Sequence, residues 1–192
     1  MTNIILASTS PFRKEILNKL QIPFTTCAPN IDEQAKKNES PHELVQRLSI
    51  EKAQACAKQS DNTLIIGSDQ VAVIDNEIVG KPHNHENAIK QLRNASGKEV
   101  TFLTGLCLFN SNTEKYQADV IPFTVVFRKL TTKQIENYLN KEQPYNSAGS
   151  FKSEGLGICL FEKLIGDDPN TLIGLPLIRL TKMFEQENFL IL

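Results

Sequence analysis

Two cations stand where a predicted helix begins near the amino terminus, at a position that usually carries an acidic residue. The segment Ala7-Ser8-Thr9-Ser10-Pro11-Phe12-Arg13-Lys14 contains this start, because Ser10 is a favourable N-cap and Pro11 a favourable first helical residue. The unpaired N–H groups of a helix start carry a partial positive charge, to which Arg13 and Lys14 add. A bound anion such as phosphate would offset this repulsion, whereas two side chains that extend into solvent would need no ligand.

A lysine falls inside the apolar stripe of a second helix, predicted over residues 41–59. At 100° per residue from Leu44, Leu48 lies at about 40°, Lys52 at about 80° and Cys56 at about 120°. A buried lysine is costly unless it is paired, so this position predicts an anionic partner. A side chain that reaches solvent from the edge of the stripe is the alternative.

Carboxylates occur at two places where they suit catalysis. The segment Gly67-Ser68-Asp69-Gln70 directly follows an apolar run that predicts a buried strand, and Asp32-Glu33 lies in the polar loop at residues 30–40. An acidic residue at the end of a strand suits a general base or a Mg²⁺ ligand, and the loop pair would supply a second oxygen ligand. An aspartate that only turns the chain, and a surface charge pair, are the alternatives.

Two further segments have residue types that suit a nucleotide. Gly80-Lys81-Pro82 forms a rigid corner that would aim an ammonium group at phosphate, although it is not a Walker motif. The small residues of the segment 148–157 allow a ligand to approach the backbone closely, and Glu154 would accept two hydrogen bonds from the edge of a base. For this segment an ordinary loop is the alternative.

The elements that must position these residues alternate between strands and helices in the first half of the chain. A long antiparallel pair follows, and together they predict an α/β protein with a mixed sheet, in which ligands bind at the carboxyl ends of strands. The predicted strands are 4–7, 63–67, a hairpin of 71–74 and 77–79 around Asp75-Asn76, 100–110, 117–128 and 158–164. The predicted helices are 11–20, 41–59, 84–95, 131–140 and 172–187, the last interrupted by Pro176.

The charge balance disfavours two classes of partner. The 192 residues contain 21 Lys and Arg against 22 Asp and Glu, a net charge of -1, which argues against bulk binding to nucleic acid or to an anionic membrane. No apolar run approaches the roughly 20 residues of a membrane span, and the uncharged start does not resemble a signal peptide.

Cysteine and histidine usage argues against zinc and redox chemistry. Cys27, Cys56, Cys107 and Cys159 are widely spaced and form no CxxC pair, so they are predicted to be reduced core residues of a cytoplasmic protein. With only three histidines in the chain, neither a His-based metal site nor a Ser-His-Asp triad is expected.

The chain as a whole resembles the Maf family of nucleoside-triphosphate pyrophosphatases, because a set of motifs occurs in order over nearly its full length. Each motif is weak alone, and the ordered set is specific. They are the 6–13 segment Leu-Ala-Ser-Thr-Ser-Pro-Phe-Arg, Gly67-Ser68-Asp69-Gln70-Val71, Gly80-Lys81-Pro82, the 92–97 segment Leu-Arg-Asn-Ala-Ser-Gly, Thr104-Gly105, the 148–157 loop, and Asn170-Thr171-Leu172-Ile173-Gly174-Leu175-Pro176-Leu177.

The details resemble one subgroup, whose members hydrolyse 7-methyl-GTP. Many family members have Arg where Phe12 stands, Ala-Asp-Thr where Ser68-Asp69-Gln70 stands, and Gln where Glu154 stands. A base methylated at N7 is cationic, which favours stacking on an aromatic face and a nearby carboxylate. We therefore expect Phe12 to stack on the base, Glu154 to accept from its N–H groups, and Gln70 to add polar discrimination.

The resemblance implies a single Maf-like domain over residues 1–192, with a mixed twisted sheet flanked by helices and two lobes around a central cleft. It implies hydrolysis of the α–β phosphoanhydride of a nucleotide with Mg²⁺ or Mn²⁺, in a cytoplasmic protein, with a homodimer as the expected assembly. Asp69 is the expected general base and, with Glu33, a metal ligand. The residues expected to bind the triphosphate are Ser8, Arg13, Lys52 and Lys81.

Two alternatives remain at this stage. One is a Maf enzyme for dTTP, UTP or other modified nucleotides, which Phe12, Gln70 and Glu154 disfavour. The other is a non-enzymatic regulator of cell division or a nucleic-acid-binding module, suggested by the family's historical link to septum formation and disfavoured by the near-neutral charge.

Overall fold

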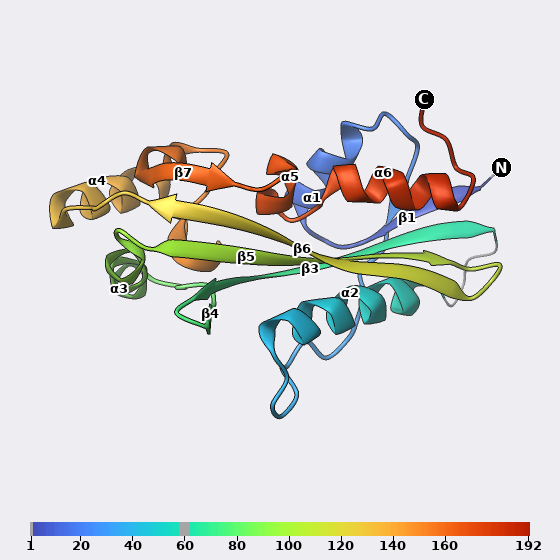
Figure 1. Cartoon of the computed structure of the whole chain (residues 1–192), viewed down its shortest axis with the longest axis horizontal. Coiled ribbons are helices and arrows are strands. Elements are labelled where there is room, and N and C mark those ends of the chain that lie inside the picture. Colours follow the sequence, from blue (N-terminus) through green and yellow to red (C-terminus); the bar gives the residue numbers. More distant parts are fainter. Residues whose placement is uncertain (1, 58–61) are drawn as a thin grey trace. The chain divides into compact units, whose positions relative to one another are not determined.

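Seven strands form one mixed sheet in the part of the chain that the computed structural model describes, residues 2–57 and 62–192 (Figure 1). The order is β2-β1-β3-β5-β6-β7, and β4 pairs with β3. β1 is parallel to β2 and β3, whereas β4 and β7 are antiparallel to their partners. The predicted α/β class with a mixed sheet is confirmed. The strands are β1 Asn3–Ala7, β2 Thr25–Thr26, β3 Thr63–Ile74, β4 Glu77–Val79, β5 Glu99–Asn110, β6 Lys115–Phe127 and β7 Phe161–Ile165.

The helices predicted from residues 11, 41, 84 and 131 begin within one residue of these positions, whereas the one predicted from residue 172 begins at Pro169, where the Asp168 side chain caps it. Ser10 accepts a hydrogen bond from the Arg13 N–H, and Asn84 and Thr131 cap later helices in the same way. Ser40 and Glu43 form a complete capping box. The helices are α1 Pro11–Asn18, α2 Pro41–Ala57, α3 His85–Ala95, α4 Thr132–Glu142, α5 Pro169–Ile173 and α6 Leu177–Gln186. The predicted end of α2 near Gln59 lies outside the described residues.

One strand contradicts the sequence-based prediction, because β3 runs without a break through Gly67, Ser68, Asp69 and Gln70. Gly67 suggested a strand end, but its role is spatial: a Cβ there would overlap the Ser49 carbonyl oxygen and lie 2.8 Å from the Ala53 nitrogen. The glycine therefore allows α2 to lie close against β3. The pairing of β1 with β3 ends at Ala7 and Gly67, so Asp69 lies just beyond the end of β1.

The chain divides into two compact units. Unit 1 comprises Met1–Gln70, Thr104–Ile121 and Asp168–Leu192, and unit 2 comprises Val71–Leu103 and Pro122–Asp167. The strands β3, β5 and β6 each contribute residues to both units.

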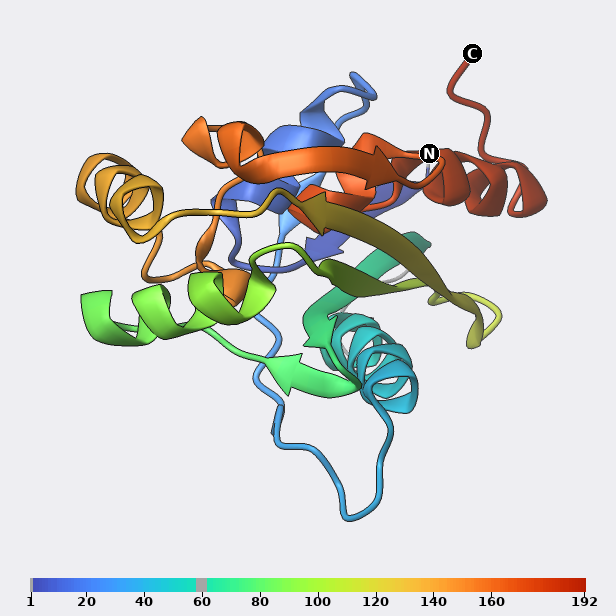
Figure 2. The ribbon, with the colours of Figure 1, turned by 60° about the vertical axis from the view of Figure 1, so that its left-hand side comes forward.

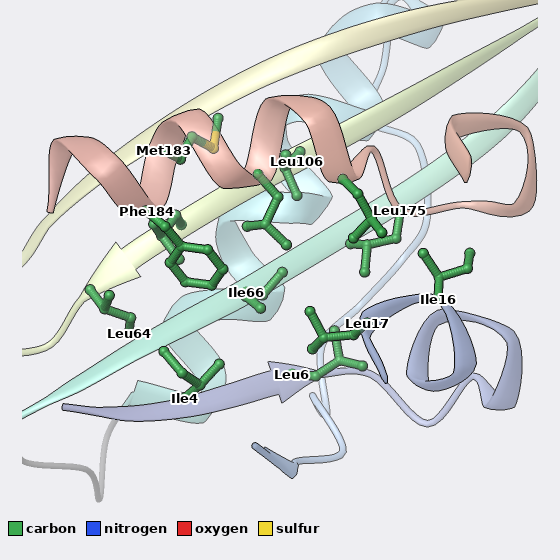
Figure 3. Packing of buried hydrophobic residues seen from close by; sticks show 13 residues of the cluster. Ile4, Leu6, Ile16, Leu17, Leu64, Ile66, Leu106, Leu175, Met183 and Phe184 are labelled. Atoms are coloured by element: carbon green, nitrogen blue, oxygen red, sulfur yellow. The ribbon is translucent and has the colours of Figure 1, made fainter. Parts of the chain in front are cut away.

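Alternate side chains of the unit 1 strands enter two apolar layers. Ile4, Leu6, Leu64 and Ile66 pack with α1 and α6 on one face, where Phe184 is fully buried (Figure 3). Ala7, Ile65 and Cys107 pack with α2 on the other face (Figure 1). Burial of both faces explains why these strands are continuous apolar runs, and each fully buried Leu or Ile contributes about 1.5–3 kcal/mol.

Unit 2 has an aromatic core of its own. Phe151 makes edge-to-face contacts with Phe102, Phe127 and Phe161, with ring centroids 5.0–5.4 Å apart. The helices α3 and α4 lie side by side (Figure 2). Because Phe151 belongs to the 148–157 segment, this core anchors that loop.

The start of the last strand and the state of the cysteines differ from the sequence-based predictions, whereas the break at Pro176 agrees with them. The last strand begins at Phe161 rather than residue 158, because residues 156–160 form a 3₁₀ turn. The interruption at Pro176 is confirmed, since α5 ends before it and α6 begins after it. The expectation of four reduced core cysteines is wrong: Cys27 and Cys56 form a disulfide, and Cys159 is exposed.

The disulfide could not be read from the spacing, because 29 residues separate the two cysteines. Cys27, directly after β2, and Cys56, in the last turn of α2, come together because both pack on the same apolar layer of unit 1. None of the helices in the described residues has the length and apolar character needed to cross a membrane.

Candidate functional site

A buried lysine bridges two carboxylates in unit 1. The Lys52 Nζ lies 2.6 Å from Asp69 Oδ1 and 2.9 Å from Glu33 Oε1. Lys52 is 6% exposed and Asp69 8% exposed, whereas the Glu33 side chain is largely accessible. The anionic partner predicted from the apolar stripe of α2 is therefore confirmed, and it is supplied by the chain itself.

Close packing of α2 on the sheet places Lys52 within reach of Asp69. A Cβ at Gly67 would overlap Ser49, and a Cβ at Gly105 would overlap the Val45 carbonyl. These two glycines lie on β3 and β5, so α2 contacts the backbone of both strands. Each glycine belongs to a motif singled out in the sequence, and the structure gives both the same physical role.

The loop that carries Glu33 is tied to α2 by Arg47, a residue that the sequence analysis did not single out. Its guanidinium donates to both Glu39 carboxylate oxygens, at 2.6 and 2.8 Å, and to the Gln34 carbonyl at 3.1 Å. The hydrogen bonds from Arg47 lower the pKa of Glu39 to about 2, so the pair is ionised at neutral pH. These contacts therefore restrict the part of the loop that follows Glu33, from Gln34 to Glu39.

Arg13 adds a second cation close to the two carboxylates. Its Nε donates to the Gly174 carbonyl at 2.9 Å, and the Ser68 hydroxyl donates to the same oxygen at 2.9 Å. Burial lowers the pKa of Arg13, while the charges of Asp69 and Glu33 act in the opposite direction. An arginine keeps its charge under such conditions. The two positive charges of Arg13 and Lys52 thus equal the two negative charges of Asp69 and Glu33. The Gly174 carbonyl fixes the orientation of the Arg13 guanidinium.

The other residues predicted at the start of α1 have different environments. Ser8 is buried, and its Oγ accepts the Ser10 N–H at 3.1 Å. Phe12 is 42% exposed, so an aromatic face is accessible. Lys14 lines a surface hollow with Asn18 and residues 22–26. Phe12 thus presents an accessible aromatic ring, whereas the Ser8 hydroxyl is buried and bonded to the start of the helix.

Gln70 has a fixed amide orientation. Its Nε2 donates to Thr104 Oγ1 at 2.8 Å and to the Thr171 carbonyl at 2.7 Å. Because a backbone carbonyl can only accept, these contacts require the NH₂ group on that side. The Gln70 Oε1 receives no hydrogen bond from the described residues, so it is free to accept one. Thr104 and Thr171, which both belong to the ordered motifs of the sequence, hold this side chain.

Lys81 and Glu154 belong to unit 2 and are both exposed. Glu154 accepts a hydrogen bond from the Ser153 hydroxyl at 3.3 Å. The glycines of its loop allow close packing within the protein rather than the approach of a ligand. A Cβ at Gly157 would overlap the Lys152 carbonyl, and a Cβ at Gly155 would lie 2.8 Å from Glu142 Oε2. Glu142, another residue not singled out from the sequence, also accepts the Leu156 N–H at 2.9 Å.

The donor set of unit 1 fits a hard divalent cation that also binds substrate and water. Two carboxylate oxygens, from Glu33 and Asp69, converge on one cationic group, the Lys52 ammonium. Mg²⁺ commonly uses one or two carboxylates together with water and phosphate oxygens. No group of three or more His, Cys, Asp or Glu residues that could hold a metal occurs among residues 2–57 and 62–192. Any bound metal would therefore depend on oxygens from the substrate and from water.

Comparison with known proteins identifies close relatives over the whole chain. A family model described as "Maf-like protein" matches residues 3–187. A protein of Colwellia psychrerythraea named 7-methyl-GTP pyrophosphatase is 62% identical over 186 residues, covering 97% of this chain and 93% of that protein. One of Aliivibrio fischeri with the same name is 58% identical, covering 100% of this chain and 99% of that protein.

Among solved structures, the Staphylococcus aureus Ham1 protein overlaps with a TM-score of 0.48 at 13% identity, covering 81% of this chain and 90% of that chain. That overlap is too weak to support an argument about function.

Proposed function

The chain belongs to the Maf family, and from that membership we propose that it hydrolyses 7-methyl-GTP to 7-methyl-GMP and pyrophosphate. The observation that carries the proposal is the buried pair of Asp69 and Lys52, to which the accessible Glu33 is also bonded, with Arg13 beside it. It combines a carboxylate that can take a proton with cations that attract a triphosphate. The relatives named 7-methyl-GTP pyrophosphatase, at 54–62% identity, support the choice of substrate.

In this proposal Asp69 is the general base. A water molecule adds to one phosphorus of the α–β anhydride, its proton passes to the Asp69 carboxylate, and the bridging P–O bond breaks to leave pyrophosphate. Lys52 orients the Asp69 carboxylate through its 2.6 Å hydrogen bond. A residue held in this way needs little reorganisation when the water is deprotonated.

The triphosphate is assigned to Ser8, Arg13, Lys52 and Lys81. Arg13 is fixed by the Gly174 carbonyl through Nε, which leaves its terminal N–H groups to face the anion. A Mg²⁺ or Mn²⁺ ion held by Glu33, Asp69 and the phosphates would neutralise charge that develops on the leaving group. Lys81, exposed in unit 2, adds a further ammonium.

The base is assigned to Phe12, Gln70 and Glu154. The exposed ring of Phe12 suits stacking on a cationic base, and an arginine at this position would repel that base. The Gln70 Oε1, which has no donor among residues 2–57 and 62–192, is an acceptor, and the Glu154 carboxylate accepts hydrogen bonds from the N1–H and N2–H₂ groups of guanine. All three groups therefore favour a positively charged, donor-rich base edge.

Pyrophosphate release from a panel of nucleotides tests the proposal. The panel contains 7-methyl-GTP, GTP, dTTP and UTP, each with Mg²⁺, with Mn²⁺ and with excess EDTA. We expect 7-methyl-GTP to have the highest kcat/KM and EDTA to abolish turnover. Preference for dTTP or UTP would support the nearer alternative, and release from no nucleotide would favour a non-enzymatic role.

Three further properties stay predictions. A homodimer is tested by the mass of the purified chain in solution. A cytoplasmic location is tested by fractionation, and the Cys27–Cys56 disulfide removes one argument for it, since the cysteines were expected to be reduced. A role in cell division is tested by deletion with rescue by a catalytically inactive variant.

A further inference from the structure

The helix α3 presents two side-chain amides to the corner that carries Lys81. Gln91 Nε2 donates to the Gly80 carbonyl at 3.1 Å, and Asn87 Nδ2 donates to the Pro82 carbonyl at 3.0 Å. The two amides are one helical turn apart and therefore lie on the same face of α3. They bond the carbonyl groups of the two residues that flank Lys81, whose own side chain is exposed and has no hydrogen bond or ion pair within the described part of the chain.

The other end of the Gln91 amide bonds a second segment of unit 2. Gln91 Oε1 accepts a hydrogen bond from the Ser150 hydroxyl, in the loop that carries Glu154. Ser150 is fully buried and has a φ of 64°, next to Gly149 with a φ of 73°. A left-handed conformation is unfavourable at a residue other than glycine, so it persists where surrounding contacts hold it. The hydroxyl bond to Gln91 is one such contact.

The two partners of Gln91 leave no choice in how its amide is oriented. The Gly80 carbonyl can only accept, so the NH₂ group faces it, and the oxygen then faces the Ser150 hydroxyl, which donates. The Gln91 side chain thus donates to one segment and accepts from the other at the same time, which requires the amide group with its NH₂ donor and its oxygen acceptor.

From this geometry we propose that Gln91 is a positioning residue, which places Lys81 for the triphosphate and the 148–157 loop for the base of the same nucleotide. The inference rests on the proposed function. Because the Lys81 side chain lacks an anchor among the described residues, the position of its ammonium depends on the corner that Gln91 and Asn87 hold. Glu154 depends in the same way on a loop fixed by Phe151 and Ser150.

Two substitutions at Gln91 separate its two bonds. Gln91→Leu removes both, and we expect KM for 7-methyl-GTP to rise about 10-fold with kcat within about 3-fold of wild type, the pattern of lost ground-state binding. It should also reduce the preference for 7-methyl-GTP over GTP. Gln91→Glu keeps an acceptor for Ser150 but sets a carboxylate oxygen against the Gly80 carbonyl. It should therefore raise KM similarly while retaining most of the preference.

A glutamine on another helix supplies the control. Gln54 is exposed on α2 and has no side-chain hydrogen bond within the described residues, so Gln54→Leu makes the same chemical change without the contacts. We expect its KM, kcat and substrate ranking to match wild type. If Gln91→Leu also matches wild type, or lowers kcat and melting temperature with KM unchanged, Gln91 has no positioning role.

Hydrogen–deuterium exchange keeps the inference separate from the proposed function. If wild type releases pyrophosphate from no nucleotide, the proposed function fails, and so does the role assigned to Gln91 in substrate binding. Exchange in residues 80–83 and 148–153 then decides whether the contact itself exists. Faster exchange in both segments of Gln91→Leu, and not of Gln54→Leu, would support the coupling, and unchanged exchange would overturn it.

Discussion

The two units hold their charged residues in opposite ways. In unit 1, Lys52 and Asp69 are buried and Arg13 is partly buried, and each is fixed through its own side chain by an ion pair or a backbone carbonyl. In unit 2, Lys81 and Glu154 are exposed, and it is the backbone beneath them that is fixed, by side chains such as Gln91. One unit positions charged groups directly and the other positions the segments that carry them.

This difference predicts where stability and function are linked. A buried ion cluster cannot lose one member without leaving another uncompensated, so substitutions there affect both folding and catalysis. An exposed group on a fixed loop can be replaced at little cost in stability, so substitutions there affect binding alone. Matched pairs of variants, one from each unit, test this contrast.

The largest effect is expected at Asp69. Asp69→Asn keeps the size of the side chain and an oxygen for Lys52, but it removes the group that takes the proton from water. We expect kcat to fall at least about 10³-fold, which is about 4 kcal/mol in the barrier, with an unchanged circular dichroism spectrum. Asp75→Asn in unit 2 alters an exposed pair with Lys98 and should leave kcat unchanged. Retention of most activity by Asp69→Asn would remove Asp69 from the mechanism.

The next effect is on stability and concerns two glycines. Gly67→Ala in unit 1 places a methyl group against the Ser49 carbonyl and the Ala53 nitrogen, which are backbone atoms that can yield only if α2 moves. We expect a loss of about 3 kcal/mol in the free energy of unfolding, measured by urea denaturation. Gly80→Ala in unit 2 meets no atom within 4 Å and should change that free energy by less than about 0.5 kcal/mol. Equal effects would show that α2 does not depend on close approach to β3.

Lysine substitutions give the third contrast. Lys52→Met removes the cation that bridges Asp69 and Glu33, so we expect kcat/KM to fall about 100-fold and the melting temperature to drop. Lys98→Met breaks an exposed pair with Asp75, for which a change of less than about 1 kcal/mol is typical, and should leave kcat/KM unaltered. A Lys52→Met enzyme as stable and active as Lys98→Met would mean that the buried cluster serves neither purpose.

Local signals in the sequence predicted local structure well. Ser10 caps its helix as expected, and the helices expected from residues 84 and 131 are capped by Asn84 and Thr131, because capping depends on residues within one turn. The burial of Lys52 was likewise predicted, since the helical period alone places it between Leu48 and Cys56. The need for an anionic partner followed from its burial.

Contacts between segments that are far apart in the chain could not be predicted from the sequence. The break expected at Gly67 does not exist, because the glycine accommodates a helix about 20 residues earlier in the chain, and no local pattern reports that approach. The disulfide between Cys27 and Cys56 and the bridge from Gly80 through Gln91 to Ser150 depend equally on packing between separate elements. Residue types in the sequence therefore indicated the candidate catalytic and binding residues, but not the residues from other elements that position them.

The smallest expected effect concerns substrate preference and requires one change in each unit. The double substitution Phe12→Arg with Glu154→Gln replaces an exposed aromatic ring by a cation and a carboxylate by a neutral amide. Both changes disfavour a cationic base, so we expect the ratio of kcat/KM for 7-methyl-GTP to that for UTP to fall about 10-fold or more, with little change in stability. Because both side chains are exposed, a large loss of stability would contradict the contrast between the units. An unchanged ranking across the nucleotide panel would instead reject the assignment of these residues to the base.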